Sequence, residues 1–252
     1  MVFTAERVHE SSANDAPVFY RQLFAYLEVE KYIQGDVLEV GCGDGYGTKR
    51  LLPLAKSYTG VDKFVSETVT KLDNLNFIQM NIPPFTGFAD NSFDVVISFQ
   101  VIEHIQNDTL YMEEIRRVLK PGGKFIFSTP NKKMSLTRNP YHIREYILSD
   151  YQKLCSKYSS YELQGVFGDE KVMEYYQKNK ESVKKITRWD ILNLQYNLPR
   201  FLLKIPYDLA NSLNRKKLAE NNTELTHGIT AQNYFIAPAT EDCLDFFCIA
   251  VK

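Results

Sequence analysis

Short apolar runs alternate with amphipathic stretches over the first two thirds of the chain. Apolar residues at near-helical spacing predict a helix over 17–33, and the pattern then changes to a short apolar run typical of a strand at 37–40. Similar runs predict strands at 57–62, 76–80, 93–98, 124–128, 161–167 and 246–251. The helices predicted between the strands are 48–55, 108–119 and 149–157. Strands that alternate with helices indicate an α/β fold with a doubly wound, mainly parallel sheet.

The pattern breaks down after the sixth predicted strand. Residues 169–222 are rich in Lys, Tyr, Leu and Asn and cannot be arranged as strand–helix–strand units, although 172–176 and 191–196 indicate helices. We therefore predict four segments: an N-terminal helical segment (1–34), a core (35–168), a helical cap on the substrate side (169–240) and the last core strand (241–252).

Composition and charge exclude several classes of protein. The 30 basic and 31 acidic side chains give a net charge of −1, so no overall basic field favours nucleic acid as a partner. No apolar run approaches the ~20 residues of a membrane span, and the N-terminus lacks the apolar region of a signal peptide. The 4 cysteines form no C-x-x-C pair, which indicates reduced thiols in a cytoplasmic protein and no metal site. The oligomeric state stays open.

A glycine-rich segment carries the strongest local signal. Gly41, Gly43 and Gly45 follow the first predicted strand and precede a helix, where glycines permit a tight turn and let a ligand approach the backbone. The G-x-G-x-G spacing differs from the G-x-G-x-x-G of dinucleotide-binding enzymes. Asp62 ends the next predicted strand, where an acid can bind a ribose diol.

Several motifs together resemble one enzyme family. The sequence at 37–45 is similar to the first motif of class I S-adenosylmethionine-dependent methyltransferases, and Asp62 matches their acidic ribose position. Further similarity lies at 91–105 and 117–123, while 128–131 and 139–145 resemble subgroups that act in ubiquinone and surface-glycan biosynthesis. The resemblance implies a Rossmann-like sheet of seven strands with the last strand antiparallel, a helical insertion or lid before it, and a small-molecule acceptor.

The resemblance also implies a set of residues that bind S-adenosylmethionine. Glu39, Gly41 and Gly43 would contact the methionine part, Asp62 the ribose, and the end of the third strand the adenine. At that third strand, Asn81 replaces the usual Asp; an amide oxygen can still accept a hydrogen bond but adds no charge. The complete predicted cofactor set is Glu39, Gly41, Cys42, Gly43, Gly45, Asp62, Lys63, Asn81, Ile82, Phe99 and Gln100.

Transfer of a methyl group to a hydroxyl needs a base, and histidine is the natural base near neutral pH. His104 follows the fourth predicted strand and His142 follows the fifth, so both are expected at the same edge of the sheet. We favour His142 as the base, with Glu145 fixing its tautomer, and His104 as a wall of the acceptor pocket. His227 is a weaker candidate within the cap, and His9 lies in a polar N-terminal stretch.

Two other functions stay open from the sequence alone. An NAD(P)-dependent oxidoreductase is disfavoured by the glycine spacing. A protein that binds S-adenosylmethionine without catalysis would keep the cofactor residues but lack an acceptor pocket.

Overall fold

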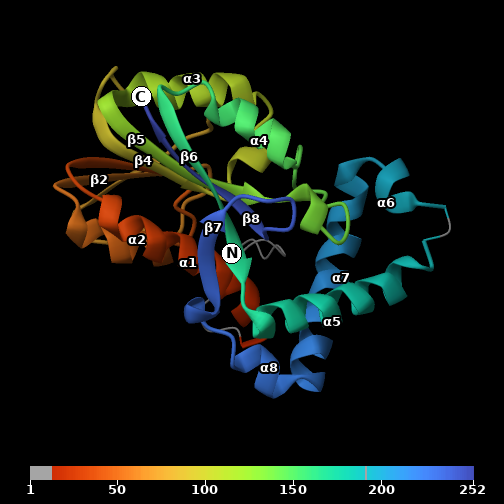
Figure 1. The fold of residues 1–252 in the computed structure, drawn as a ribbon. Helices are drawn as coiled ribbons and strands as arrows, with labels where there is room; N and C mark the ends of the chain where they lie inside the picture. Colours follow the sequence, from red (N-terminus) through yellow and green to blue (C-terminus); the bar gives the residue numbers. More distant parts are fainter. Residues whose placement is uncertain (1–12, 191) are drawn as a thin grey trace. The chain divides into compact units, whose positions relative to one another are not determined.

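A computed structural model describes residues 13–190 and 192–252 of the chain. Within this range, eight strands form one sheet in the order β3-β2-β1-β4-β5-β8-β6-β7 (Figure 1). Their bounds are β1 (Asp36–Val40), β2 (Ser57–Asp62), β3 (Leu75–Gln79), β4 (Phe93–Phe99), β5 (Leu119–Pro130), β6 (Ser160–Gly168), β7 (Tyr234–Pro238) and β8 (Asp245–Val251).

The sheet has the predicted doubly wound topology. Strands β1 to β5 pair in parallel, and β8 inserts antiparallel between β5 and β6. The expectation of seven strands is wrong by one, because residues 234–238, which lie within the predicted helical cap, form an additional strand next to β6. This strand is short and only Tyr234 in it is buried, so it lacks the apolar run that reveals the inner strands.

Eight α-helices occur in the described part of the chain: α1 (Ala16–Val29), α2 (Tyr46–Leu51), α3 (Asp108–Val118), α4 (Leu148–Cys155), α5 (Glu170–Thr187), α6 (Leu194–Asn197), α7 (Arg200–Asn221) and α8 (Thr223–His227). Two of them begin at side-chain caps: Asn107 accepts a hydrogen bond from the Leu110 N–H at α3, and Asp169 accepts one from the Val172 N–H at α5. None of these helices combines the length and the hydropathy needed to cross a bilayer.

The chain divides into two compact units. Among the described residues, the core unit contains 25–133, 144–166 and 236–252; the helical unit contains 13–24, 134–143, 167–190 and 192–235. Compared with the predicted segments, the division falls earlier in the N-terminal region and adds 134–143 to the helical unit.

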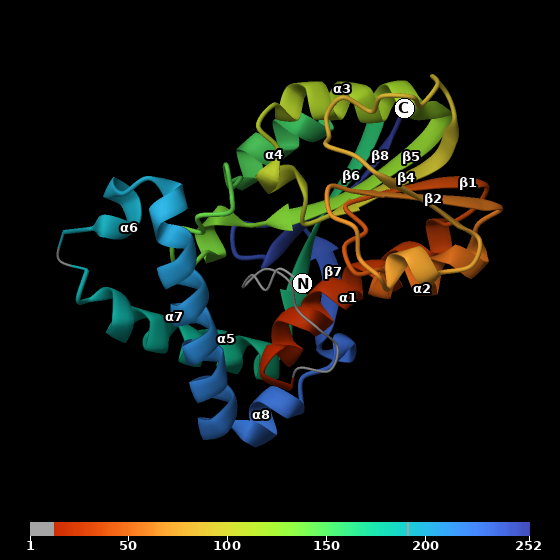
Figure 2. The same ribbon diagram turned by 180° about the vertical axis from the view of Figure 1, so that it is seen from behind.

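The core unit is built on a fully buried central strand. The side chains of Val95, Val96 and Ile97 in β4 are almost completely inaccessible, and Phe125 and Phe127 of β5 stack with ring centroids 4.3 Å apart. Figure 2 shows α3 and α4 on one face of the sheet and α2 on the other. Cover on both faces explains why these strands read as continuous apolar runs.

Candidate functional site

The glycine loop after β1 makes a sharp turn into α2. Gly41, Gly43 and Gly45 have φ angles of 81°, 54° and 76°, the left-handed region that favours glycine. The Gly41 N–H donates to the Val61 carbonyl at 2.8 Å, and the Gly45 N–H donates to the Cys42 carbonyl at 2.9 Å. The loop is therefore fixed against the end of β2.

The three glycines differ in what a side chain would meet. A Cβ at Gly41 would overlap the Val101 side chain, and one at Gly45 would lie 2.8 Å from a methyl group of Val69. A Cβ at Gly43 would meet nothing within 4 Å. Gly41 and Gly45 are therefore required by packing, whereas Gly43 borders open space that a ligand can fill.

Asp62 joins the glycine loop to the end of β2. One carboxylate oxygen accepts a hydrogen bond from the Gly43 N–H and the other accepts one from the Phe64 N–H, both at 2.9 Å. A carboxylate oxygen has two acceptor sites, so both oxygens keep capacity for a ribose diol. The neighbouring Lys63 places its ammonium over the Phe64 ring, 4.9 Å from the centroid.

Glu39 lies in the interior behind this loop, with 1% of its surface exposed. Its carboxylate accepts hydrogen bonds from the hydroxyls of Tyr26, Thr48 and Tyr58 at 2.8, 2.6 and 2.9 Å. Burial raises the pKa of Glu39, and these three bonds partly oppose the shift. The side chain thus ties β1 to α1, α2 and β2, a structural role that the sequence analysis did not predict. Cys42 is also buried.

The segment around Phe85 and Phe88, which follows β3, is hydrogen-bonded to the ion pair formed by Glu114 and Arg117 of α3. The Arg117 guanidinium donates to the carbonyls of Phe85 and Phe88 at 3.2 and 2.7 Å, and Glu114 accepts from the Phe85 N–H at 2.9 Å. Hydrogen bonds from Arg117 lower the pKa of Glu114. These contacts order a segment whose role the sequence left undefined. Immediately before this segment in the sequence, Asn81 is exposed and Ile82 is half-buried.

The end of β4 contains an unusual backbone conformation. Gln100 has a φ of 57°, its N–H donates to the Ser128 carbonyl at 3.1 Å, and its side-chain amide donates to the Ser128 hydroxyl at 3.3 Å. The preceding Phe99 is buried and packs edge-to-face on Tyr26. Strained backbone of this kind costs about 1–3 kcal/mol and concentrates at functional sites. The assignment of Phe99 and Gln100 to the site stays a prediction.

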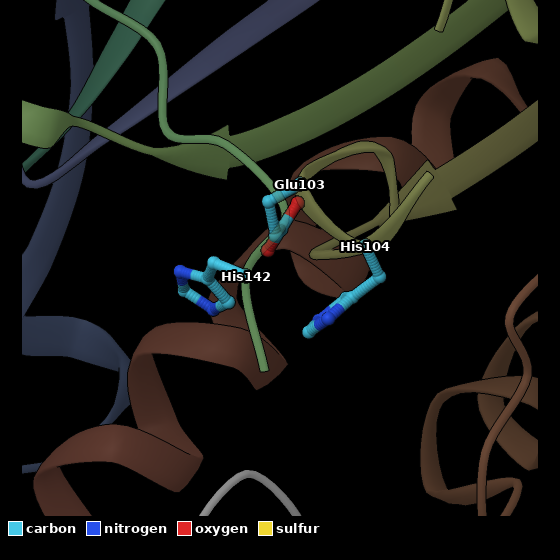
Figure 3. Close-up of side chains that lie close together, drawn as sticks. All are labelled: Glu103, His104 and His142. Atoms are coloured by element: carbon cyan, nitrogen blue, oxygen red, sulfur yellow. The ribbon is translucent and has the colours of Figure 1, made fainter. Parts of the chain in front are cut away.

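A short 3₁₀ helix, Ile102–His104, follows directly. Figure 3 shows the side chains of Glu103 and His104 on this turn. Glu103 is buried and accepts a hydrogen bond from the Thr129 hydroxyl at 2.9 Å, while its carbonyl accepts from the Arg144 N–H at 3.3 Å. His104 is only partly buried. The sequence analysis missed Glu103, although an acid between apolar neighbours at 101–105 was a usable signal.

Of the remaining predicted residues, Glu145 is half-buried in the core unit and His142 belongs to the helical unit. His142 Nε2 lies 2.9 Å from the Asn139 side-chain nitrogen, and the Asn139 oxygen accepts from the Tyr141 N–H at 3.0 Å. The second bond orients the amide, so the amide nitrogen donates to Nε2 and neutral His142 carries its proton on Nδ1. His227 is exposed at the end of α8, and His9 lies outside the described residues.

Comparisons with known proteins agree with this geometry. Residues 38–127 match the methyltransferase domain family, and residues 84–191 match a family of S-adenosyl-L-methionine-dependent methyltransferases. A probable S-adenosylmethionine-dependent methyltransferase of Mycolicibacterium smegmatis is 32% identical over 160 residues, which are 60% of this chain and 62% of that protein. The mitochondrial ubiquinone biosynthesis O-methyltransferase of Dictyostelium discoideum is 30% identical over 38% of this chain and 36% of that protein.

Solved structures agree at the level of the fold. A methyltransferase from Archaeoglobus fulgidus superimposes with a TM-score of 0.53 and 14% identity, covering 93% of both chains. The aligned part of the chain spans 62% of the first of these curated relatives and 36% of the second. Over residues 38–191, which the two family matches cover, the chain is similar to S-adenosylmethionine-dependent methyltransferases.

Proposed function

We propose that the protein transfers a methyl group from S-adenosylmethionine to a hydroxyl of a small-molecule acceptor. The observation that carries the proposal is the open space at Gly43 beside the Asp62 carboxylate, at the carboxyl ends of parallel strands where ligands of such sheets bind. The choice of a hydroxyl is supported by the O-methyltransferase named among the relatives.

When bound, S-adenosylmethionine supplies a methyl group already activated on a sulfonium sulfur. Asp62 would accept hydrogen bonds from the ribose hydroxyls, and the backbone at Gly43 would face the methionine part. Phe99 and Gln100 would line the methionine end, and Asn81 and Ile82 would flank the adenine. Because the reaction is an in-line displacement, these residues contribute mainly by alignment and by excluding water.

A hydroxyl acceptor must lose its proton during the transfer, and we propose that at most one of His104 and His142 takes it. In neutral His142, the Nε2 lone pair is occupied by Asn139 and Nδ1 carries the proton. His142 would therefore act as a base only after Asn139 releases it. Glu145 is proposed to fix the tautomer of His142, so a Glu145 variant is tested together with the His142 variant.

Cofactor binding is tested by calorimetric titration with S-adenosylmethionine and with NAD. A carboxylate–diol pair is worth about 1.5–3 kcal/mol, so Asp62→Ala should weaken S-adenosylmethionine binding by roughly ten- to a hundredfold. Asp73→Ala, which removes an exposed acid of the same unit, is the control and should bind normally. An unchanged affinity in Asp62→Ala, or tighter binding of NAD, would contradict the proposal.

The base is tested with methyl-labelled S-adenosylmethionine and a panel of phenols and sugars as acceptors. With an acceptor that reacts, loss of the base should reduce kcat by ~10²–10⁴ while cofactor affinity stays constant. Loss of a residue that only orients the acceptor should raise KM more than it lowers kcat. The variants are His104→Ala, His142→Ala, Glu145→Gln and Asn139→Ala; the last should shift the pH profile only if His142 is the base. Full turnover in all four would mean that alignment alone suffices, and no turnover on any acceptor would favour a non-catalytic binding protein.

A further inference from the structure

The helical unit contains a large apolar pocket that the proposed methyl transfer does not use. Its volume is about 660 Å³, within the range of ~300–1,000 Å³ typical of small-molecule sites. Every lining residue belongs to the helical unit, from the segment 137–138 and from α5, α6, α7 and the chain between them. Figure 1 shows these three helices. The apolar wall includes Ile186, Leu194, Leu198, Leu202, Leu203 and Pro206.

Both charged side chains of the pocket wall, Arg138 and Asp190, are bonded within the unit. Arg138 donates to the carbonyls of Gln195 and Tyr196 at 3.1 and 2.9 Å. The Asp190 carboxylate accepts from the N–H groups of Leu194 and Gln195 at 2.6 and 3.0 Å. The polar wall therefore stabilises the pocket itself, and a polar ligand would lose its hydration with little in return.

Asn214, deeper on α7, is bonded in the same way. Its amide donates to Asn179 at 2.7 Å, and its oxygen accepts from the Ser182 hydroxyl at 2.6 Å. An apolar ligand fits these walls better than a polar one.

Large apolar side chains at the pocket are exposed. Trp189 and Leu192, both on the wall, are 73% and 71% exposed. Exposed apolar side chains gathered in a concave site mark a place where a bound ligand covers them and removes their surface from water. A hydrocarbon chain lying along Trp189 and Leu192 would cover them in this way.

Positive charge is concentrated in the segment of chain that supplies part of the pocket wall. Residues 178–190 carry five basic and two acidic side chains, and one of the acids, Asp190, is bonded to backbone. Lys184, Lys185 and Arg188 are exposed and alternate with the wall residues Val183, Ile186 and Thr187. An anionic group at the end of an apolar ligand would complement this charge.

We propose that the helical unit binds the single hydrocarbon chain of an anionic amphiphile, of the long-chain fatty acid type. The chain occupies the apolar pocket, and the carboxylate lies near Lys184, Lys185 and Arg188. This inference does not depend on the proposed methyl transfer, because it rests on residues of the helical unit alone.

The protein carries its own reporter for this site. Trp189 is the single tryptophan of the chain and lies on the pocket wall, so its fluorescence reports occupancy directly. Dibromostearate, added below its micellar concentration, should quench Trp189 saturably at one molecule per chain, and palmitate should reverse the quenching. Each buried methylene is worth up to about fourfold in affinity, so dodecanoate, which is four methylenes shorter, should bind up to roughly two-hundredfold more weakly than palmitate. Absence of quenching, or an affinity independent of chain length, would overturn the proposal.

Paired variants locate the ligand. Ala210→Phe fills the pocket from α7 and should abolish saturable quenching, whereas Leu209→Phe adds the same ring at an exposed neighbour outside the wall and should not. Lys184→Glu with Lys185→Glu should weaken palmitate binding at least tenfold but leave hexadecanol binding unchanged. The control, Lys153→Glu with Lys157→Glu, makes the same charge change on exposed lysines of the core unit.

The lysine variants and the chain-length series keep the test decisive if Ala210→Phe does not fold. Two results identify a different occupant and would overturn the proposal. Quenching by brominated lipid in anionic vesicles, without any by monomeric dibromostearate, would indicate a membrane surface. A dimer in sedimentation that shields Trp189 would indicate a second copy of the chain.

Discussion

The three glycines after β1 share a left-handed backbone conformation but differ in what surrounds them. Gly41 and Gly45 are held by their neighbours Val101 and Val69, so a side chain at either position disturbs the packing of the core unit. Gly43 has the same kind of backbone conformation but open space beyond it. Only at Gly43 can a substitution affect a ligand without first affecting the interior.

Gly43→Ala should therefore lose S-adenosylmethionine affinity in calorimetry while its circular dichroism stays normal. The matched control is Gly122→Ala, because Gly122 also has a positive φ, of 75°, and nothing within 4 Å of an added Cβ. Both variants should lose a similar ~1–2 kcal/mol of unfolding free energy through backbone strain. If both bind the cofactor equally well, Gly43 does not contact it.

At the scale of elements, one charged cluster connects the starts of three parallel strands. The Lys120 ammonium of β5 donates to Asp36 of β1 at 2.8 Å and to Asp94 of β4 at 2.7 Å. The Asp36 N–H also donates to Asp94 at 2.8 Å. The cluster lies at the amino ends of these strands, opposite the carboxyl ends that carry the glycine loop, so it serves stability and not binding.

This cluster gives a pH dependence of defined sign. The hydrogen bond from Lys120 is the main cause that lowers the pKa of Asp36. Partial burial acts to raise the pKa of Asp94, but bonds from the Asp36 N–H and Lys120 outweigh it and lower that pKa too. An unfolded Asp titrates near about 3.9, so the unfolded chain binds more protons below that pH. The stabilisation is complete above pH ~4 and is lost as the pH falls through the folded pKa values.

Lys120→Met should therefore reduce the fall in unfolding free energy between pH 5 and pH 3, measured by urea denaturation. Lys153→Met, at an exposed position of α4, should leave that fall unchanged. A pH profile of Lys120→Met parallel to that of the unaltered chain would show that the cluster does not act as described.

Elements also show what can be predicted from sequence and why. The inner strands were predictable because burial on both faces forces unbroken apolar runs, as in β4. The hydroxyls that donate to Glu39 could not be predicted, because Tyr26, Thr48 and Tyr58 belong to three other elements and only the fold brings them together. The glycine loop itself could be located, since its glycines lie close together in the sequence.

In the whole molecule, the helical unit is the part whose structure was hardest to predict from the sequence. Its longest helix, α7, has Pro206 in its interior and presents apolar residues to a pocket and to solvent as well as to a core. Such a helix lacks the single apolar stripe by which helices are found in a sequence. Residues 169–222 therefore gave only partial helix predictions, and the pocket needed the structure to be seen.

Cofactor binding should also appear in the thermal stability of the whole molecule. A ligand that binds only the native state stabilises it by about 2.7 kcal/mol at one hundred times its Kd. For a chain of this size we expect Tm to rise by about 2–4 °C per kcal/mol, or roughly 5–11 °C in total. In Asp62→Ala, a Kd ten- to a hundredfold higher leaves about 0.4–1.4 kcal/mol at the same concentration, so the rise should shrink to less than about 6 °C. Scanning calorimetry of both proteins with and without S-adenosylmethionine measures this difference. Equal shifts would show that Asp62, although bonded to the Gly43 N–H, contributes nothing to holding the cofactor.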